Sequence, residues 1–373
     1  MNHADYSDLI NEGFNNKIAK VYADILNNEL NNACFDIVYT TWAHEHGFLA
    51  ESAYAYGLDE SNYTDYLSDY VFYKTWPLNP WTRIWINDKL TLKYLLSNTE
   101  YSDFMPKYYY YSSVDGLKKL IDAPNQLSAP SINELITLLT EEGEIACKPC
   151  NGVTSLGFNK LSFYNNIFYI NQEPVGEAEI ADFILRNPNY IFTEYLRPNK
   201  HFSIYNPHIH TLRIVTLNVN GSNPRIIGGY LRIPHKQSGE ANYIIIGSGN
   251  SEQFNIVVDV DFETGRYGPG KLTYLNRAVP IDCHPDNGVP LTGFISDYGK
   301  LKETVLSIAR RFSTIEFMGF DIGITDKGFK CMEINSQPGI KYMQLFKPLL
   351  IDPFVKQYFS SKLNTIKYKC AKK

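Results

Sequence analysis

The feature that most constrains this chain is the stretch from Gly319 to Gly339, which reads as two short strands joined by a turn. Apolar residues alternate along its first half and leave Asp321 on the opposite face. Residues 326–328 are typical of a tight turn, and the returning run places Glu333 and Asn335 two positions apart on one face. We therefore expect an antiparallel hairpin on which these three polar side chains can converge.

Two carboxylates and a carboxamide oxygen on neighbouring strands match the preference of Mg²⁺, a hard cation that proteins usually share with substrate phosphates. The hairpin thus predicts a magnesium site formed by Asp321, Glu333 and Asn335. On this stretch alone, the alternative is a hairpin whose solvent-facing side happens to carry polar residues.

Length and composition allow two domains and exclude several classes of function. The 373 residues (42.7 kDa) are 44% apolar and 20% charged, as in soluble globular proteins. A net charge of -5 with scattered basic residues argues against nucleic acid as a partner. The first residues lack the pattern of a signal peptide and no apolar run reaches membrane-spanning length, so we expect a cytoplasmic location. Six dispersed cysteines predict reduced thiols.

The first part of the chain, residues 1–80, is expected to be mainly helical, with one helix from about Leu9 to Asn32. The two prolines within residues 76–81 favour a boundary near residue 80. The triplet at residues 44–46 carries two histidines, but nothing nearby completes a ligand set, so a surface role is favoured over a metal site.

The rest of the chain alternates between predicted helices and strands. Helices are expected from residue 87, over residues 131–141 and over residues 296–313. Strands are expected over residues 145–149, 190–195, 211–219 and 225–233, with a hairpin turn at residues 220–223. His208 and His210 are also assigned to a strand, where a polar strand face is favoured over a metal site.

Lys148 leaves a predicted strand and enters a loop rich in Gly, Ser and Thr that ends near Phe158. Backbone amides of such a loop can surround a phosphate while the ammonium group neutralises it. This is no Walker motif, because the lysine precedes the glycines. Cys147 and Cys150 have the spacing of a redox pair, but the residues that follow cannot continue a helix, so we disfavour that interpretation. Residues 247–250 resemble a dinucleotide fingerprint that lacks its third glycine and its helix, and we discard it.

Arg213 and Arg232 lie within predicted strands. An arginine there is costly unless its guanidinium group reaches solvent or an anion. Together with Lys148 and the oxygen ligands of the hairpin, the two arginines favour an anionic ligand.

In their order and spacing these motifs resemble the ATP-grasp superfamily, and more closely its sugar-transfer associated branch, over about residues 85–345. The similar segments are Asn87 to Lys89, Lys148-Pro149, Thr193 to Leu196, Leu212 to Val215, Tyr230 to Arg232, Gly249-Asn250, Asp259 to Gly265 and His284 to Gly288. The resemblance implies an α+β ATP-grasp fold with two α+β lobes that sandwich ATP, after an N-terminal mainly helical extension. The lobes would span residues 81–195 and 196–360, followed by a tail over residues 361–373.

The resemblance also implies roles for individual residues. Those that would contact ATP are Lys89, Lys148, Ser155, Glu194, Tyr195, Leu196 and His201, with His201 near the ribose and Glu194 to Leu196 at the adenine. Those that would act in catalysis are Arg213, Arg232 and Lys148. Asp321, Glu333 and Asn335 match the magnesium triad of the superfamily.

The function implied is that of an ATP-dependent carboxylate–amine ligase with ATP and Mg²⁺ as cofactors. It would join an amino acid or amine to a sugar acid or glycan precursor of a cell-surface polysaccharide, by way of an acylphosphate. The alternatives are an ATP-grasp enzyme that phosphorylates a small molecule or sugar and stops there, a non-catalytic nucleotide-binding or assembly protein, and a globular protein with coincidental motifs.

Overall fold

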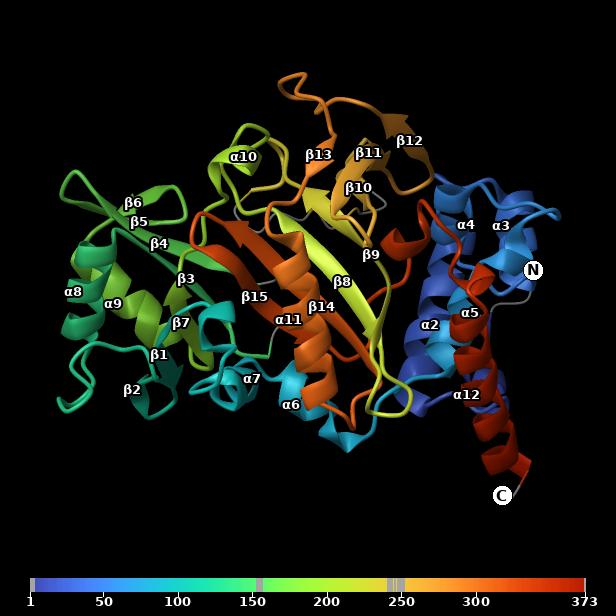
Figure 1. The fold of residues 1–373 in the computed structure, drawn as a ribbon, viewed down its shortest axis with the longest axis horizontal. Helices are drawn as coiled ribbons and strands as arrows, with labels where there is room; N and C mark the ends of the chain where they lie inside the picture. The colour runs from blue at the N-terminus through green and yellow to red at the C-terminus, as the bar shows by residue number, and fades with distance from the viewer. Residues whose placement is uncertain (1–3, 152–156, 240–243, 245, 247–251, 372–373) are drawn as a thin grey trace.

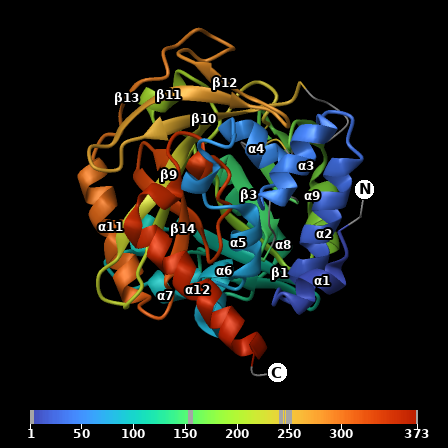
Figure 2. The same ribbon diagram turned by 90° about the vertical axis from the view of Figure 1, so that its right-hand side faces the viewer.

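The structure is a computed structural model that describes residues 4–151, 157–239, 244, 246 and 252–371, with side chains through residue 366. Three parts lie side by side in Figure 1: a sheet with α8 and α9 against it, a second sheet crossed by α11, and a group of N-terminal helices beside α12. Figure 2 shows the N-terminal helices and α12 from their own side.

The helical elements concentrate in the first hundred residues and at the end of the chain. They are α1 (Tyr6–Asn11), α2 (Asn16–Leu30), α3 (Ile37–Glu45), α4 (Ala50–Tyr56), α5 (Asp69–Lys74), α6 (Ile84–Asn87), α7 (Lys89–Leu96), α8 (Ile132–Glu142), α9 (Glu177–Arg186), α10 (Lys200–Ser203), α11 (Tyr298–Arg311) and α12 (Pro353–Ala371), with the 3₁₀ turns η1 (Tyr63–Asp65), η2 (Trp81–Arg83), η3 (Ser102–Phe104), η4 (Tyr342–Gln344) and η5 (Leu349–Ile351).

The strands form two antiparallel sheets. The first has the order β2-β1-β7-β3-β4-β5-β6, from β1 (Tyr108–Ser113), β2 (Gly116–Lys119), β3 (Glu144–Pro149), β4 (Asn159–Tyr164), β5 (Ile167–Ile170), β6 (Glu173–Val175) and β7 (Tyr190–Glu194). The second has the order β12-β11-β10-β9-β8-β14-β15, from β8 (Thr211–Leu217), β9 (Arg225–Ile233), β10 (Asn255–Val260), β11 (Arg266–Thr273), β12 (Ala278–Ile281), β14 (Phe317–Thr325) and β15 (Gly328–Asn335), and β13 (Gly293–Phe294) pairs with β11. The expected α+β class, with a mainly helical N-terminal region, is confirmed.

Local signals placed several elements correctly. Asp88 caps α7, since its side chain accepts a hydrogen bond from the backbone N–H of Thr91, and Ser131 caps α8 in the same way through Glu134. The turn between β14 and β15 ends at Gly328, whose φ of 93° is open to glycine at little cost. The hairpin predicted from alternation is therefore present.

The single helix expected from about Leu9 to Asn32 is wrong. The chain leaves α1 at Asn11, passes Gly13 with a φ of 100°, and begins α2 only after Asn15. The Asn15 side chain accepts a hydrogen bond from the N–H of Lys17 at 3.0 Å, which is a new helix start. Glycine in the left-handed region ended the helical path that the apolar spacing suggested.

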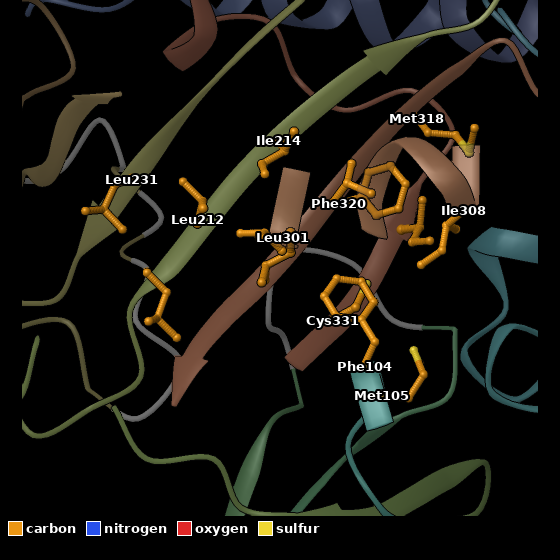
Figure 3. Packing of buried hydrophobic residues seen from close by; sticks show 14 of the residues in the cluster. Phe104, Met105, Leu212, Ile214, Leu231, Leu301, Ile308, Met318, Phe320 and Cys331 are labelled. Atoms are coloured by element: carbon orange, nitrogen blue, oxygen red, sulfur yellow. The ribbon is translucent and has the colours of Figure 1, made fainter. Parts of the chain in front are cut away.

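A large apolar core joins the second sheet to the helix α11 and to the segment before β1. Figure 3 shows Leu212, Ile214 and Phe320 from the sheet facing Leu301 and Ile308 of α11. β14 is buried along its whole length, because α11 covers one face and other segments cover the other. A polar side chain on β14 therefore lies in the interior, which makes Asp321 unusual.

Two further expectations concern membranes and thiols. No helix within the described residues is both long and apolar enough to span a bilayer. Cys34, Cys147, Cys150, Cys283 and Cys331 are free thiols.

Candidate functional site

The hairpin β14–β15 brings the three predicted metal ligands together. Asp321 and Glu333 are direct partners in the strand register, with an irregularity immediately after Asp321. The Asn335 amide nitrogen lies 3.0 Å from a Glu333 carboxylate oxygen and 3.4 Å from one of Asp321. Three side chains from two strands thus meet at one point, as the alternation predicted.

Arg213 on β8 reaches the same point. Its register partner across the sheet is Asp321, and its guanidinium group donates two hydrogen bonds to that carboxylate, one of them with an Nη2 to Oδ2 distance of 2.5 Å. Both side chains are almost fully buried, at 12% and 9% exposure. Burial opposes charge on Arg213, but Asp321, together with smaller contributions from Tyr230 and Glu333, raises the pKa of the guanidinium group.

The two carboxylates of the hairpin differ in their balance of charge. Burial raises the pKa of Asp321, and the positive charge of Arg213 lowers it in part. The negative charge of Glu333 raises it further. Burial also acts on Glu333, but the Lys89 ammonium group and hydrogen bonds from its neighbours hold the pKa of this carboxyl below its usual range. Lys89 Nζ lies 3.3 Å from the Glu333 carboxylate. Asp321 and Glu333 together form an acidic pair whose negative charge is partly neutralised by Arg213 and Lys89.

Two lysines from different elements face this acidic pair. Lys89 is the first residue of α7 and is only 6% exposed, whereas Lys148 comes from β3 of the other sheet. Burial, followed by the charge of Lys89, lowers the pKa of Lys148 to about 8. Two mutually repelling ammonium groups are costly unless an anion joins them, which favours a polyphosphate ligand between the sheets.

The residues present fit Mg²⁺. Two carboxylates and one carboxamide converge, and the raised pKa of Asp321 marks a site that an added cation would stabilise. Asn335 directs its amide nitrogen at the carboxylates, so ligation through its oxygen requires a half-turn of the carboxamide. Within the described residues no group of three or more His, Cys, Asp or Glu is placed to hold a metal.

The segment after β7 connects the two sheets. Glu194 accepts a hydrogen bond from the backbone N–H of Lys107 and forms an ion pair at 3.1 Å with Lys327 in the turn of the β14–β15 hairpin. The ring of Tyr195 lies 4.6 Å from Lys160 Nζ, and Leu196 lies near Gly323 of β14. The three predicted adenine-binding residues therefore occupy a crossing between the sheets.

The remaining predicted residues are less closely connected. Arg232 on β9 is near enough to affect the pKa of Asp321. His201 on α10 instead bonds the Tyr267 hydroxyl at 2.7 Å, and no described contact joins it to the hairpin. Ser155 and the pattern at residues 247–250 lie outside the described residues.

Several sequence interpretations need correction. His208 and His210 precede β8 and lie on no strand, and His210 is fully buried, where burial lowers its pKa to about 3. His44 lies on α3 and bonds the buried Glu29 at 2.8 Å, so the triplet at residues 44–46 is not simply surface. The thiol of Cys150 has its pKa raised to about 11, chiefly by burial, which accords with rejecting the redox pair.

Sequence reasoning missed Asn79, which holds the ends of the β14–β15 hairpin. Its amide nitrogen donates to the carbonyl oxygens of Phe317 and Ser336, each at 2.6 Å, and its oxygen accepts from the backbone N–H groups of Glu316 and Phe317. Asn87 accepts a further bond from the N–H of Ser336 at 3.0 Å. The only signal for Asn79 was its position between two prolines.

A comparison with protein families gives one match. Residues 181–352 match the model described as sugar-transfer associated ATP-grasp. The predicted resemblance is confirmed over these residues. The matched segment includes Arg213, Arg232 and the three predicted metal ligands, whereas Lys89 and Lys148 precede it. No curated protein matches the sequence.

Solved ATP-grasp structures are similar at low identity. D-alanyl-alanine synthetase A from Vibrio cholerae is 14% identical over 75% of this chain and 66% of its own, with a TM-score of 0.42. An L-amino acid ligase from Bacillus licheniformis is 11% identical over 70% of this chain and 43% of its own (TM-score 0.34). A D-alanine–D-alanine ligase from Bacillus anthracis is 14% identical over 76% of this chain and 67% of its own (TM-score 0.33). The chain thus spans less than two thirds of the length of the first two structures.

Proposed function

We propose that this chain is an ATP-dependent carboxylate–amine ligase that acts in the cytoplasm on a sugar acid or other glycan precursor. The observation that carries the proposal is the meeting of Lys89 and Lys148 with the acidic pair Asp321 and Glu333 between the two sheets. The glycan part rests on the description of the matching family.

In this proposal Asp321, Glu333 and Asn335 hold Mg²⁺, which when bound would neutralise charge on the terminal phosphates of ATP. Lys89 and Lys148 neutralise further phosphate oxygens from the opposite side. Glu194, Tyr195 and Leu196 hold the adenine at the crossing between the sheets. These tasks are the alignment and charge compensation that phosphoryl transfer requires of a protein.

The reaction would proceed in two displacements. A substrate carboxylate oxygen attacks the γ-phosphorus and ADP leaves, which gives an acylphosphate; an amine nitrogen then attacks the acyl carbon, phosphate leaves, and the amine gives up a proton. Arg213 is bound to Asp321 in the present arrangement. It keeps that carboxylate ionised and oriented, and Arg232 adds positive charge on the neighbouring strand.

The test is ADP release with ATP and Mg²⁺ against a panel of carboxylates and amines. Asp321→Asn and Glu333→Gln should each lower the rate by about a thousandfold, because a lost metal carboxylate removes several kcal/mol of transition-state stabilisation. Glu303→Gln, an exposed carboxylate of α11, is the matched control and should leave the rate unchanged. Equal, substrate-independent turnover in all four proteins would refute the ligase.

Product analysis separates the ligase from its alternative. A ligase gives a stable adduct only when both carboxylate and amine are present. A phosphorylated acceptor that accumulates in the absence of any amine would instead identify a phosphotransferase.

A further inference from the structure

Large apolar side chains are exposed on the short segment that leads into the site. Trp81 of η2 is 74% exposed, and Ile84 and Trp85 of α6 are 45% and 40% exposed. The next residue, Ile86, is 1% exposed and belongs to the main core, so the segment is firmly anchored. A fixed element that holds two indole rings in water is unusual for a surface without a partner.

Cations surround these rings. The guanidinium group of Arg83 lies 5.7 Å from the ring centroids of both Trp76 and Trp81. Arg310 and Arg311 are exposed at the end of α11. The chain continues from there to Thr314, whose hydroxyl lies 3.2 Å from that of Thr82. The end of α11 and the tryptophan segment therefore form one surface.

The C-terminal helix borders this surface. Lys362 of α12 forms an ion pair at 2.5 Å with Glu316, two residues after Thr314. Lys356 is exposed on the same helix, and the sequence of α12 has no acidic residue, although the whole chain has a net charge of -5. Figures 1 and 2 both show α6, α7 and the far end of α12 along the lower edge of the molecule.

Acidic groups on this edge do not cancel the charge. Glu316 is paired with Lys362, and Glu100 faces Arg311. Among the side chains that the structure describes on this surface, the charges of Arg83 and Arg310 are left. The local charge is thus opposite in sign to that of the chain.

We propose that this aromatic–basic surface, formed by Trp81, Arg83, Ile84, Trp85, Arg310 and Arg311, binds the face of an anionic lipid bilayer. Indole rings are favoured at the boundary between headgroups and acyl chains, and arginines there meet the negative phosphates. Asn87 and Lys89, which follow this segment directly, contact Ser336 and Glu333 of the candidate site. Docking would therefore hold the site close to the lipid surface. The inference does not depend on the reaction that the site performs.

The test is co-sedimentation of the full chain with phosphatidylcholine vesicles that contain about a third phosphatidylglycerol. We expect binding that weakens with added salt and a blue shift of tryptophan fluorescence. The double variant Trp81→Ala/Trp85→Ala should reduce partitioning about tenfold or more. The variant Arg310→Gln/Arg311→Gln should reduce partitioning about twenty-five-fold, since each basic residue near an anionic surface contributes about fivefold.

The matched control is Tyr164→Ala/Phe294→Ala, which removes two aromatic side chains outside this surface that are 68% and 63% exposed. It should bind as the wild type does. Melting temperatures distinguish lost docking from misfolding, and the arginine variant tests the surface without changing apolar side chains. Equal binding to vesicles of phosphatidylcholine alone, no binding to either, or an equal loss in the control would each overturn the proposal. So would a dimer that the tryptophan variant dissociates, which would make this surface an interface between two copies.

Discussion

Arg213 and Asp321 form a two-pronged ion pair in the interior of the second sheet, across the register of β8 and β14. The pair stands at the centre of the candidate metal site, and neither partner is stable there alone. Variants of the two residues therefore measure how much the ion pair contributes to the stability of the protein.

Arg213→Met should lower the free energy of unfolding by about 3 to 5 kcal/mol, because it leaves the Asp321 carboxylate buried without its cation. Urea denaturation measures this change. Arg186→Met is the matched control: Arg186 also pairs with an aspartate, Asp182, but at 78% and 50% exposure, so its loss should cost about 0.5 kcal/mol or less.

Arg213→Met/Asp321→Asn should recover part of the stability lost in Arg213→Met, since the carboxamide carries no charge to compensate. A double variant less stable than the sum of the single changes would show that the ion pair is not the source of the effect.

The sequence predicted those parts of the fold whose signals are local. Alternation over β14 and β15 and the glycine of their turn act within a few residues, and this hairpin is where we expected it. The prediction of one helix through Gly13 was also wrong for a local reason. It relied on the spacing of apolar residues, which does not reveal the left-handed conformation of Gly13.

The candidate site was predictable only as a set of residues. Which arginine pairs with Asp321 depends on the register of β8 against β14, over 108 positions of sequence. The two prolines beside Asn79 do not reveal its role, because its partners Phe317 and Ser336 lie 238 and 257 residues away. Contacts of this kind leave no periodic pattern in the chain.

Asn79→Ala should destabilise the protein by on the order of 4 kcal/mol, because it leaves several buried backbone groups without hydrogen-bond partners. It should also weaken ATP binding measured with Mg²⁺, since the strand end that carries Asn335 loses its anchor. The control is Asn31→Ala, an exposed asparagine with one bond to the carbonyl of Asn27. Thermal denaturation of both variants decides: equal melting temperatures would contradict the anchoring role.

Lys148 gives the proposed ATP site a dependence on pH. Burial and the neighbouring Lys89 lower its pKa to about 8, so a growing fraction is neutral above that pH. Because phosphate prefers the charged form, ATP affinity should fall by up to about tenfold for each pH unit above about 8. Titration calorimetry with ATP at several pH values above and below about 8 measures this change in affinity.

Two replacements check that this dependence comes from Lys148. Lys148→Arg should bind ATP with an affinity that is flat across the same range, because arginine stays charged. Lys148→Met should bind weakly at every pH. A wild-type affinity that does not change above pH 8 would remove Lys148 from contact with the phosphates.

Asp69 gives the N-terminal helical region a separate dependence on pH. It is 5% exposed and accepts hydrogen bonds from the N–H of Leu49 at 2.9 Å and from the hydroxyl of Ser52 at 3.2 Å. Burial is the main cause that raises its pKa to about 7, with smaller contributions from Glu51 and Glu29. The folded state thus favours the protonated carboxyl more than the unfolded state does.

Protonated Asp69 therefore stabilises the folded state more at acidic than at neutral pH. The stabilisation by protonated Asp69 is fully present below its unfolded pKa of about 4 and is lost as pH rises to about 7. Asp69→Asn, which cannot ionise, should be more stable than the wild type above about pH 7, by up to about 4 kcal/mol, and the difference should shrink toward about pH 4. Asp24→Asn, at an exposed aspartate of α2 in the same helical region, should keep the pH dependence of the wild type. Urea midpoints of the three proteins across this range give the comparison, and parallel curves for the wild type and Asp69→Asn would show that Asp69 stays ionised in the fold.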